Sequence, residues 1–164
     1  MTMEKLLRRV YESKRLSVFL KTVSHIATAV SGMAFAFLAV VAFLKSPLSL
    51  LKLAVITGVP FVAVTVIRKL INAPRPYELY EFFSTLPKER CGSSFPSRHS
   101  FSAFAIGTAL CFFYPIIGAT VLVFGLLMCA SRVLLGIHFI RDVVCGALIG
   151  VGTSVIGMMI LSPF

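Results

Sequence analysis

Charged residues are scarce in this chain of 164 residues, and acidic residues are the scarcest. Charged side chains make up 13% of the chain and hydrophobic ones 58%, with 6 acidic residues against 16 basic ones. An ordinary soluble domain carries about 25% charged residues, so this composition excludes that class. The mean hydropathy of +0.96 predicts a single membrane domain over residues 1–164. Because its apolar segments are near the ~20 residues that a spanning helix needs, we expect it to be all-helical.

Paired cysteines are also missing. Cys91, Cys111, Cys129 and Cys145 occur singly, with no CxxC pair and no spacing typical of metal ligands. Asp142 is the only acidic residue near the centre of the polar clusters described below. We therefore expect the cysteines to pack structurally, and we predict neither a metal site nor a cofactor.

Long apolar runs make up most of the chain. Each comes near the ~20 residues that a membrane-spanning helix needs. They predict a multi-pass bundle of about five transmembrane helices in the cell (plasma) membrane. The predicted spans are residues 18–44, 48–67, 99–114, 115–135 and 143–161.

The basic residues lie at the edges of these apolar runs, where they favour lipid headgroups as partners rather than nucleic acid. In residues 1–17, Leu6, Leu7 and Val10 are interspersed with Lys and Arg, which predicts an amphipathic helix on the membrane surface. The cations of this segment outnumber those of the first connection between spans. The positive-inside rule therefore favours the cytoplasm for the N-terminus.

Three polar clusters interrupt the apolar pattern: RKLINAPRP at residues 68–76, FPSRHS at 95–100 and SRVLLGIHFIRD at 131–142. Threading the chain through the bilayer places all three on the face that also carries the N-terminal helix. They supply cations, hydroxyls, histidines and a carboxylate, the groups that phosphoryl transfer requires. The candidate site residues are Arg68, Arg75, Ser97, Arg98, His99, Arg132, His138 and Asp142.

His138 and Asp142 are the candidates for the reacting pair. Their spacing of four residues would place them on one face of a helix, where Asp142 accepts a hydrogen bond from one ring nitrogen and the other is free to attack. His99 begins an apolar helix after Ser97, a position suited to binding an anion and to protonating a leaving oxygen. Arg75 and Arg132 each offer a planar fork to phosphate oxygens.

These clusters resemble the signatures of the type 2 phosphatidic acid phosphatase (PAP2) superfamily, Lys-x6-Arg-Pro, Pro-Ser-Gly-His and Ser-Arg-x5-His-x3-Asp. The third signature matches completely, from Ser131 to Asp142. The second has Arg98 in the glycine position. The first has Arg68 in the lysine position, with Lys69 one residue off register. The resemblance covers residues 68–142, about half of the chain.

The resemblance implies hydrolysis of a lipid phosphate or diphosphate through a phosphohistidine, without a metal ion. His138 would be the nucleophile, Asp142 its orienting partner and His99 the general acid. The substrates it implies are phosphatidic acid, phosphatidylglycerophosphate or an isoprenyl diphosphate, at a site on the membrane interface. It implies as phosphate binders Arg68, Arg75, Ser97, Arg132 and the backbone at position 98.

Three alternatives stay open. The side chain of Arg98 either adds a phosphate contact or points away into the headgroup layer. The protein either hydrolyses its lipid or binds or translocates it without catalysis. Gly146 and Gly150 form a GxxxG pattern that favours close helix packing within the chain, with a homo-oligomer as the second interpretation.

Overall fold

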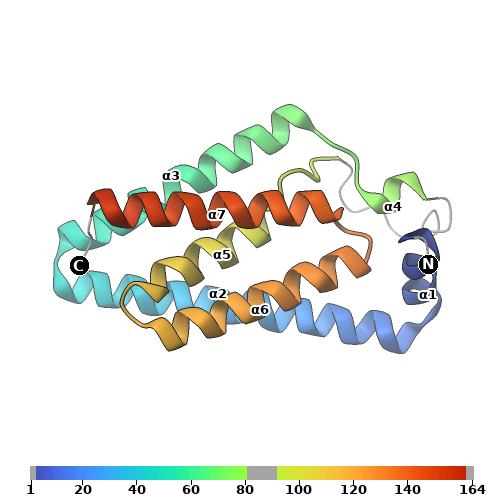
Figure 1. Ribbon diagram of the computed structural model, residues 1–164, viewed down its shortest axis with the longest axis horizontal. Coiled ribbons are helices and arrows are strands. Elements are labelled where there is room, and N and C mark those ends of the chain that lie inside the picture. The colour runs from blue at the N-terminus through green and yellow to red at the C-terminus, as the bar shows by residue number, and fades with distance from the viewer. Residues whose placement is uncertain (1–2, 81–91, 162–164) are drawn as a thin grey trace.

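The computed structural model describes residues 3–80 and 92–161, and over that part of the chain every regular element is an α-helix. The predicted all-helical class is therefore confirmed. Figure 1 shows the long helices running beside one another, with α1 at one end of the bundle. The helices are α1 (Met3–Glu12), α2 (Lys14–Lys45), α3 (Pro47–Ile71), α4 (Pro76–Leu79), α5 (Arg98–Cys111), α6 (Pro115–Leu134) and α7 (Ile140–Leu161).

Four of these helices, α2, α3, α6 and α7, are long and apolar enough to cross a membrane. Their outer surfaces are apolar: Phe43, Leu70 and Ile116, on three different helices, are 59%, 79% and 83% exposed. Large apolar side chains in such numbers on the outside of a bundle suit contact with lipid rather than with water. The chain is an integral membrane protein.

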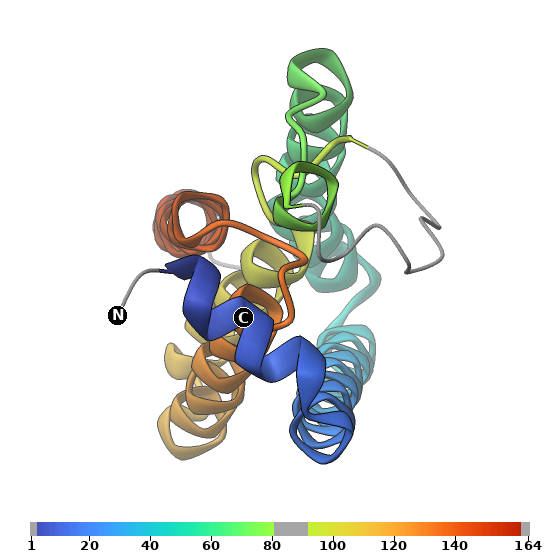
Figure 2. The same ribbon diagram turned by 90° about the vertical axis from the view of Figure 1, so that its right-hand side faces the viewer.

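α5 stands in the place of the third predicted span and is shorter than the other four. Its 14 residues reach about 21 Å, against a hydrocarbon core of about 30 Å. Figure 2 shows α5 at the centre of the bundle, among the other long helices, and most of its side chains are buried. The backbone of residues 92–97, just before α5, is irregular. Its N–H and C=O groups form hydrogen bonds with other parts of the protein, so this segment can lie within the bundle without being helical.

Two glycines bring α7 close to α5. A Cβ atom on Gly146 would strike the carbonyl oxygen of Ser97, and one on Gly150 would strike that of Phe101. Neither position therefore accepts a side chain without moving the helices apart. The GxxxG pattern serves packing within the chain, and a homo-oligomer stays a prediction.

The N-terminal helix is shorter than the predicted residues 1–17, because the helix ends before Ser13 and a new helix, α2, begins after it. The Oγ of Ser13 accepts a hydrogen bond from the backbone N–H of Leu16 at 3.4 Å, so Ser13 is the N-cap of α2. On α1, Leu7 and Val10 are buried. Figure 2 shows α1 crossing the end of the bundle, where it packs on α2 and α6. Part of its apolar face is thus covered by protein and not by lipid.

The three polar clusters lie at the same end of the bundle as α1. Figure 1 shows α4, the connection from α6 to α7 and the entry to α5 toward that end, with the α2–α3 connection and the C-terminus at the other. This arrangement agrees with the threading predicted from the sequence. We call it the site end of the bundle.

Candidate active site

His138 and Asp142 meet at the start of α7, and a third side chain joins them. Both residues are buried, and His138 Nδ1 lies 3.7 Å from Asp142 Oδ2, which is longer than a hydrogen bond. Ser94 bridges the two. Its Oγ donates to Asp142 Oδ2 at 2.5 Å and lies 3.2 Å from His138 Nδ1. Asp142 therefore acts on the ring through a serine hydroxyl.

This relay from Asp142 through Ser94 to His138 fixes the proton on the ring. An ionised carboxylate only accepts hydrogen bonds, so the hydroxyl hydrogen of Ser94 points to Asp142. The Ser94 oxygen then accepts from His138, which places the ring hydrogen on Nδ1. Nε2 is left with a free lone pair, the form that a nucleophilic histidine needs.

The geometry around Asp142 differs from the shared helix face expected from the spacing. His138 precedes α7, which begins at Ile140, so the two residues do not lie on one helix. Asp142 instead accepts a hydrogen bond from the backbone N–H of Phe139 at 3.0 Å. This is the capping-box contact between the third residue of a helix and its N-cap. The first turn of α7 thus holds the carboxylate in place.

Arg68 and Arg75 hold the backbone that leads into α5. Arg68 Nη1 donates to the carbonyl oxygen of Pro96 at 3.1 Å, and Arg75 Nε donates to that of Gly92 at 3.1 Å. Both arginines are buried. A guanidinium has five N–H donors, so one bond to the backbone leaves others for phosphate oxygens.

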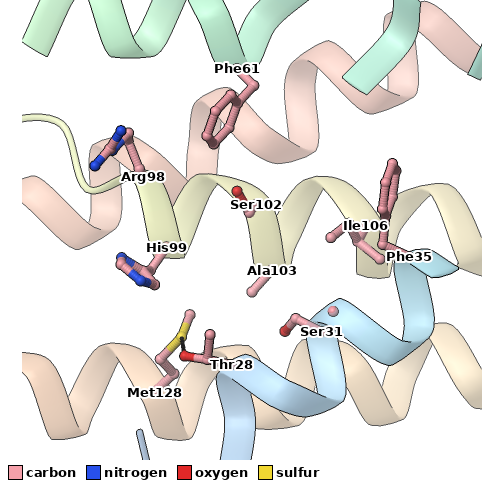
Figure 3. Close-up of a pocket in the computed structure, with 11 residues that line it drawn as sticks. Thr28, Ser31, Phe35, Phe61, Arg98, His99, Ser102, Ala103, Ile106 and Met128 are labelled. Carbon is pink, nitrogen blue, oxygen red and sulfur yellow. Dashed lines mark hydrogen bonds between the residues drawn. The ribbon is translucent and has the colours of Figure 1, made fainter. Parts of the chain in front are cut away.

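Ser97 caps α5, and the two residues after it line a cavity. Ser97 Oγ accepts hydrogen bonds from the backbone N–H of Ser100 at 3.4 Å and from its hydroxyl at 3.0 Å. The backbone N–H of Ser97 donates to the carbonyl oxygen of Asp142 at 2.9 Å, which ties α5 to α7. Arg98 and His99 lie at one end of a cavity of about 370 Å³ between α2, α3, α5 and α6 (Figure 3).

Arg132 brings a third cation from the last turn of α6, and its side chain is half-buried. Its Nε is buried and has no hydrogen-bond partner among the described residues. A buried donor without a partner costs about 1–3 kcal/mol. Arg132, Arg68 and Arg75 all act electrostatically on His138. A bound phosphate would accept a hydrogen bond from Arg132 Nε and would offset the positive charge of the three arginines.

The surroundings of His138 lower its pKa. Burial of the ring is the main cause, and the three arginines add to it, whereas the interaction with Asp142 acts in the opposite direction. The ring is therefore neutral at pH 7, in agreement with the tautomer that the relay requires.

Metal ligands are not gathered at this site. Within the described residues, no group of three or more His, Cys, Asp or Glu side chains is arranged to hold a metal ion. Cys111, Cys129 and Cys145 are free thiols, and Cys91 lies outside the described residues. The expected absence of a metal and of a cofactor stays a prediction.

The structure brings all the predicted site residues together at the site end of the bundle, through the contacts above and the mutual electrostatic effects of the cations and histidines. Sequence reasoning missed Ser94. It directly precedes the second cluster, but it lies 48 positions before Asp142. The one feature of the sequence that could have indicated Ser94 is its hydroxyl, which can donate one hydrogen bond and accept another.

Comparisons with known proteins agree with these signatures. The sequence profile of the PAP2 superfamily matches residues 49–163. The bacitracin transport permease protein BcrC of Bacillus licheniformis is 31% identical over 99 residues, which cover 57% of this chain and 48% of that protein. The match thus spans about half the length of this relative.

Two crystal structures share the fold. LpxE from Aquifex aeolicus superposes with a TM-score of 0.70 and 27% identity, covering 94% of this chain and 93% of that chain. The first transmembrane PAP2-type phosphatidylglycerolphosphate phosphatase from Bacillus subtilis gives a TM-score of 0.69 and 21% identity, covering 96% and 83%. The second likeness concerns the fold alone.

Proposed function

This chain belongs to the PAP2 superfamily, and we propose that it hydrolyses a phosphate or diphosphate ester of a membrane lipid without a metal ion. The observation that carries the proposal is the relay from Asp142 through Ser94 to His138 beside the three arginines. A protein that only binds or translocates lipid phosphates needs the cations. It does not need a buried ring held with Nε2 free.

In the proposed reaction, Nε2 of His138 attacks phosphorus and forms an N–P bond while the P–O bond to the lipid breaks. The bound phosphate offsets the cations around His99 and lets its ring take up a proton, which His99 then gives to the departing oxygen. Water then cleaves the phosphohistidine, which releases inorganic phosphate and restores the ring. Arg68, Arg75 and Arg132 stabilise the charge on the phosphate oxygens in both steps.

The test is phosphate release by purified protein in detergent with EDTA, using a panel of lipid phosphates and diphosphates. His138→Ala is expected to lose activity by about 10³-fold or more, since it removes the nucleophile. His25→Ala is the matched control, because His25 is exposed on α2 and should leave the rate unchanged. Equal activity of wild type and His138→Ala would overturn the proposal, and loss of all activity in EDTA would overturn its metal-independent part.

We also infer that the site faces the cytoplasm from the plasma membrane. The cations at the site end outnumber those near the α2–α3 connection, which the positive-inside rule associates with the cytoplasm. Labelling of Lys5→Cys in intact and permeabilised cells tests this, with the wild-type protein as the control for its own cysteines. Labelling in intact cells would refute it. The cations compared are Lys5, Arg8, Arg9, Lys14, Arg15 and Lys21 against Lys45 and Lys52.

A further inference from the structure

The cavity beside His99 continues as an apolar groove along α5. A second cavity of about 290 Å³ extends it between α2, α3 and α5. The two cavities share Phe35, Phe61, Ser102 and Ile106. Figure 3 shows Arg98 and His99 at one end of the first cavity and mostly apolar side chains along the rest. A narrow apolar space of this kind, leading away from charged groups at one end, fits the hydrocarbon chain of a lipid.

Arg98 carries its charge at the head of this groove. Its side chain is half-buried, and it has no hydrogen bond or ion pair with a described residue. Its side chain lines the cavity that His99 also lines (Figure 3), and its charge acts on both Arg68 and His99. It therefore lies beside the phosphate site and not out in the headgroup layer. A partly buried cation next to other cations is unfavourable until an anion joins it. The position of Arg98 therefore calls for a negative group.

The chemistry of the site decides to which part of the substrate that group belongs. In an in-line displacement the leaving oxygen departs on the side opposite the nucleophile. His99, the proton donor, marks that side, and the groove begins there. Arg98 is the neighbour of His99, lines the same cavity and acts electrostatically on that ring. Arg75 acts on the attacking ring of His138, and Arg68 and Arg132 act on both histidines. An anion on Arg98 is thus part of the leaving group.

We propose that Arg98 is a specificity residue that binds an anionic leaving group, so that the preferred substrate is a lipid diphosphate. This inference rests on the proposed function. His138 Nε2 would form a bond to the terminal phosphorus while the bond from that phosphorus to the bridging oxygen breaks. The electron pair stays on the bridging oxygen, which takes a proton from His99. The lipid monophosphate leaves with its remaining phosphate held by Arg98, and water then releases the transferred phosphate from His138.

The experiment compares two substrates that differ only in the second phosphate, farnesyl diphosphate and farnesyl monophosphate, in detergent micelles. The measured quantity is the selectivity, kcat/KM for the diphosphate divided by kcat/KM for the monophosphate. Wild type is expected to favour the diphosphate. Arg98→Ala is expected to lower the selectivity about 10- to 100-fold, as the loss of a hydrogen-bonded charge pair would. Arg98→Lys keeps the charge without the planar fork and should fall between the two.

Lys69→Ala is the matched control, since Lys69 is an exposed cation at the same end of the bundle and should leave the selectivity as in wild type. An equal selectivity in wild type and Arg98→Ala, or a wild type that prefers the monophosphate, would overturn the inference and leave the proposed function intact. A selectivity that falls equally in Arg98→Ala and Lys69→Ala would overturn it as well, because it would reflect the net charge of the surface. Hydrolysis of neither farnesyl substrate nor any lipid of the panel would overturn the proposed function itself.

Discussion

Ser94→Ala tests the relay at its least expected member. The substitution removes the donor to Asp142 Oδ2 and the acceptor of the proton on His138 Nδ1. Asp142 would keep the backbone N–H of Phe139 as its hydrogen-bond donor. Its Oδ1, which has no hydrogen-bond partner among the described residues, would keep the ion pair with Arg141 Nε at 3.6 Å. The ring would lose the contact that holds Nε2 free for attack.

The size of the effect follows from the nature of this hydrogen bond. A hydrogen bond to a charged group contributes about 1.5–3 kcal/mol, which corresponds to a loss of about 10- to 150-fold in kcat/KM. The loss should stay well below the ~10⁴-fold that a wrong tautomer causes. His138 and Asp142 are only 3.7 Å apart, so without the hydroxyl the ring can turn and form the direct bond.

The assay is phosphate release from the preferred lipid, together with the Tm of each variant in detergent. Ser154→Ala is the control: Ser154 is also buried and donates to the carbonyl oxygen of Ala105 at 2.8 Å, but it lies about 18 Å along α7 from Asp142. It should lower the Tm and leave kcat/KM unchanged. Ser94→Thr, which keeps the hydroxyl, should recover activity. The same kcat/KM in Ser94→Ala and Ser154→Ala would refute a role for the relay.

Two further predictions concern pH and packing. In the pH profile of kcat/KM, the midpoint of the fall on the acid side should lie below the ordinary histidine pKa of about 6.5. Burial lowers the pKa of His138, and only the neutral ring attacks. Asp142→Asn should move this midpoint lower still, since the carboxylate raises this pKa, and a midpoint at or above the ordinary histidine pKa would contradict the assignment. Gly146→Ala should lower the free energy of unfolding by about 1–3 kcal/mol, because its methyl group strikes the Ser97 carbonyl oxygen. Both the Tm and kcat/KM should fall as a result. Gly152→Ala has open space and should do neither; equal Tm values would count against this packing.

Much of the fold could be predicted because lipid imposes a simple rule on sequence. Apolar runs of sufficient length are recognisable one by one, and the predicted residues 48–67 and 143–161 fall inside α3 and α7. Boundaries decided by a single side chain were less accessible. Ser13 divides a continuous helical pattern by capping α2, which the periodicity of the flanking residues does not reveal.

The site was predictable as far as its members lie within contiguous motifs. The spacing from Arg132 to Asp142 identifies groups that a helix end and the following turn bring together. It cannot show how they touch. Asp142 turned out to cap α7 and to reach His138 through Ser94, because the chain between the clusters folds back against α7. Contacts across 48 residues depend on the packing of α5 and α7, which local sequence does not encode.

The two departures from the PAP2 signatures, Arg68 and Arg98, have different consequences. Arg68 stands where the signature has lysine, and its guanidinium donates to the Pro96 carbonyl with N–H groups to spare. An ammonium has three donors around one point, so it would have to divide them between that carbonyl and the phosphate. This departure strengthens the hold on the backbone and leaves the charge of the cradle unchanged. Arg98, in the glycine position, adds a cation beside His99 in the cavity. In the proposed reaction it would bind the leaving group, and so would change which substrate the site selects and not how the site attacks it.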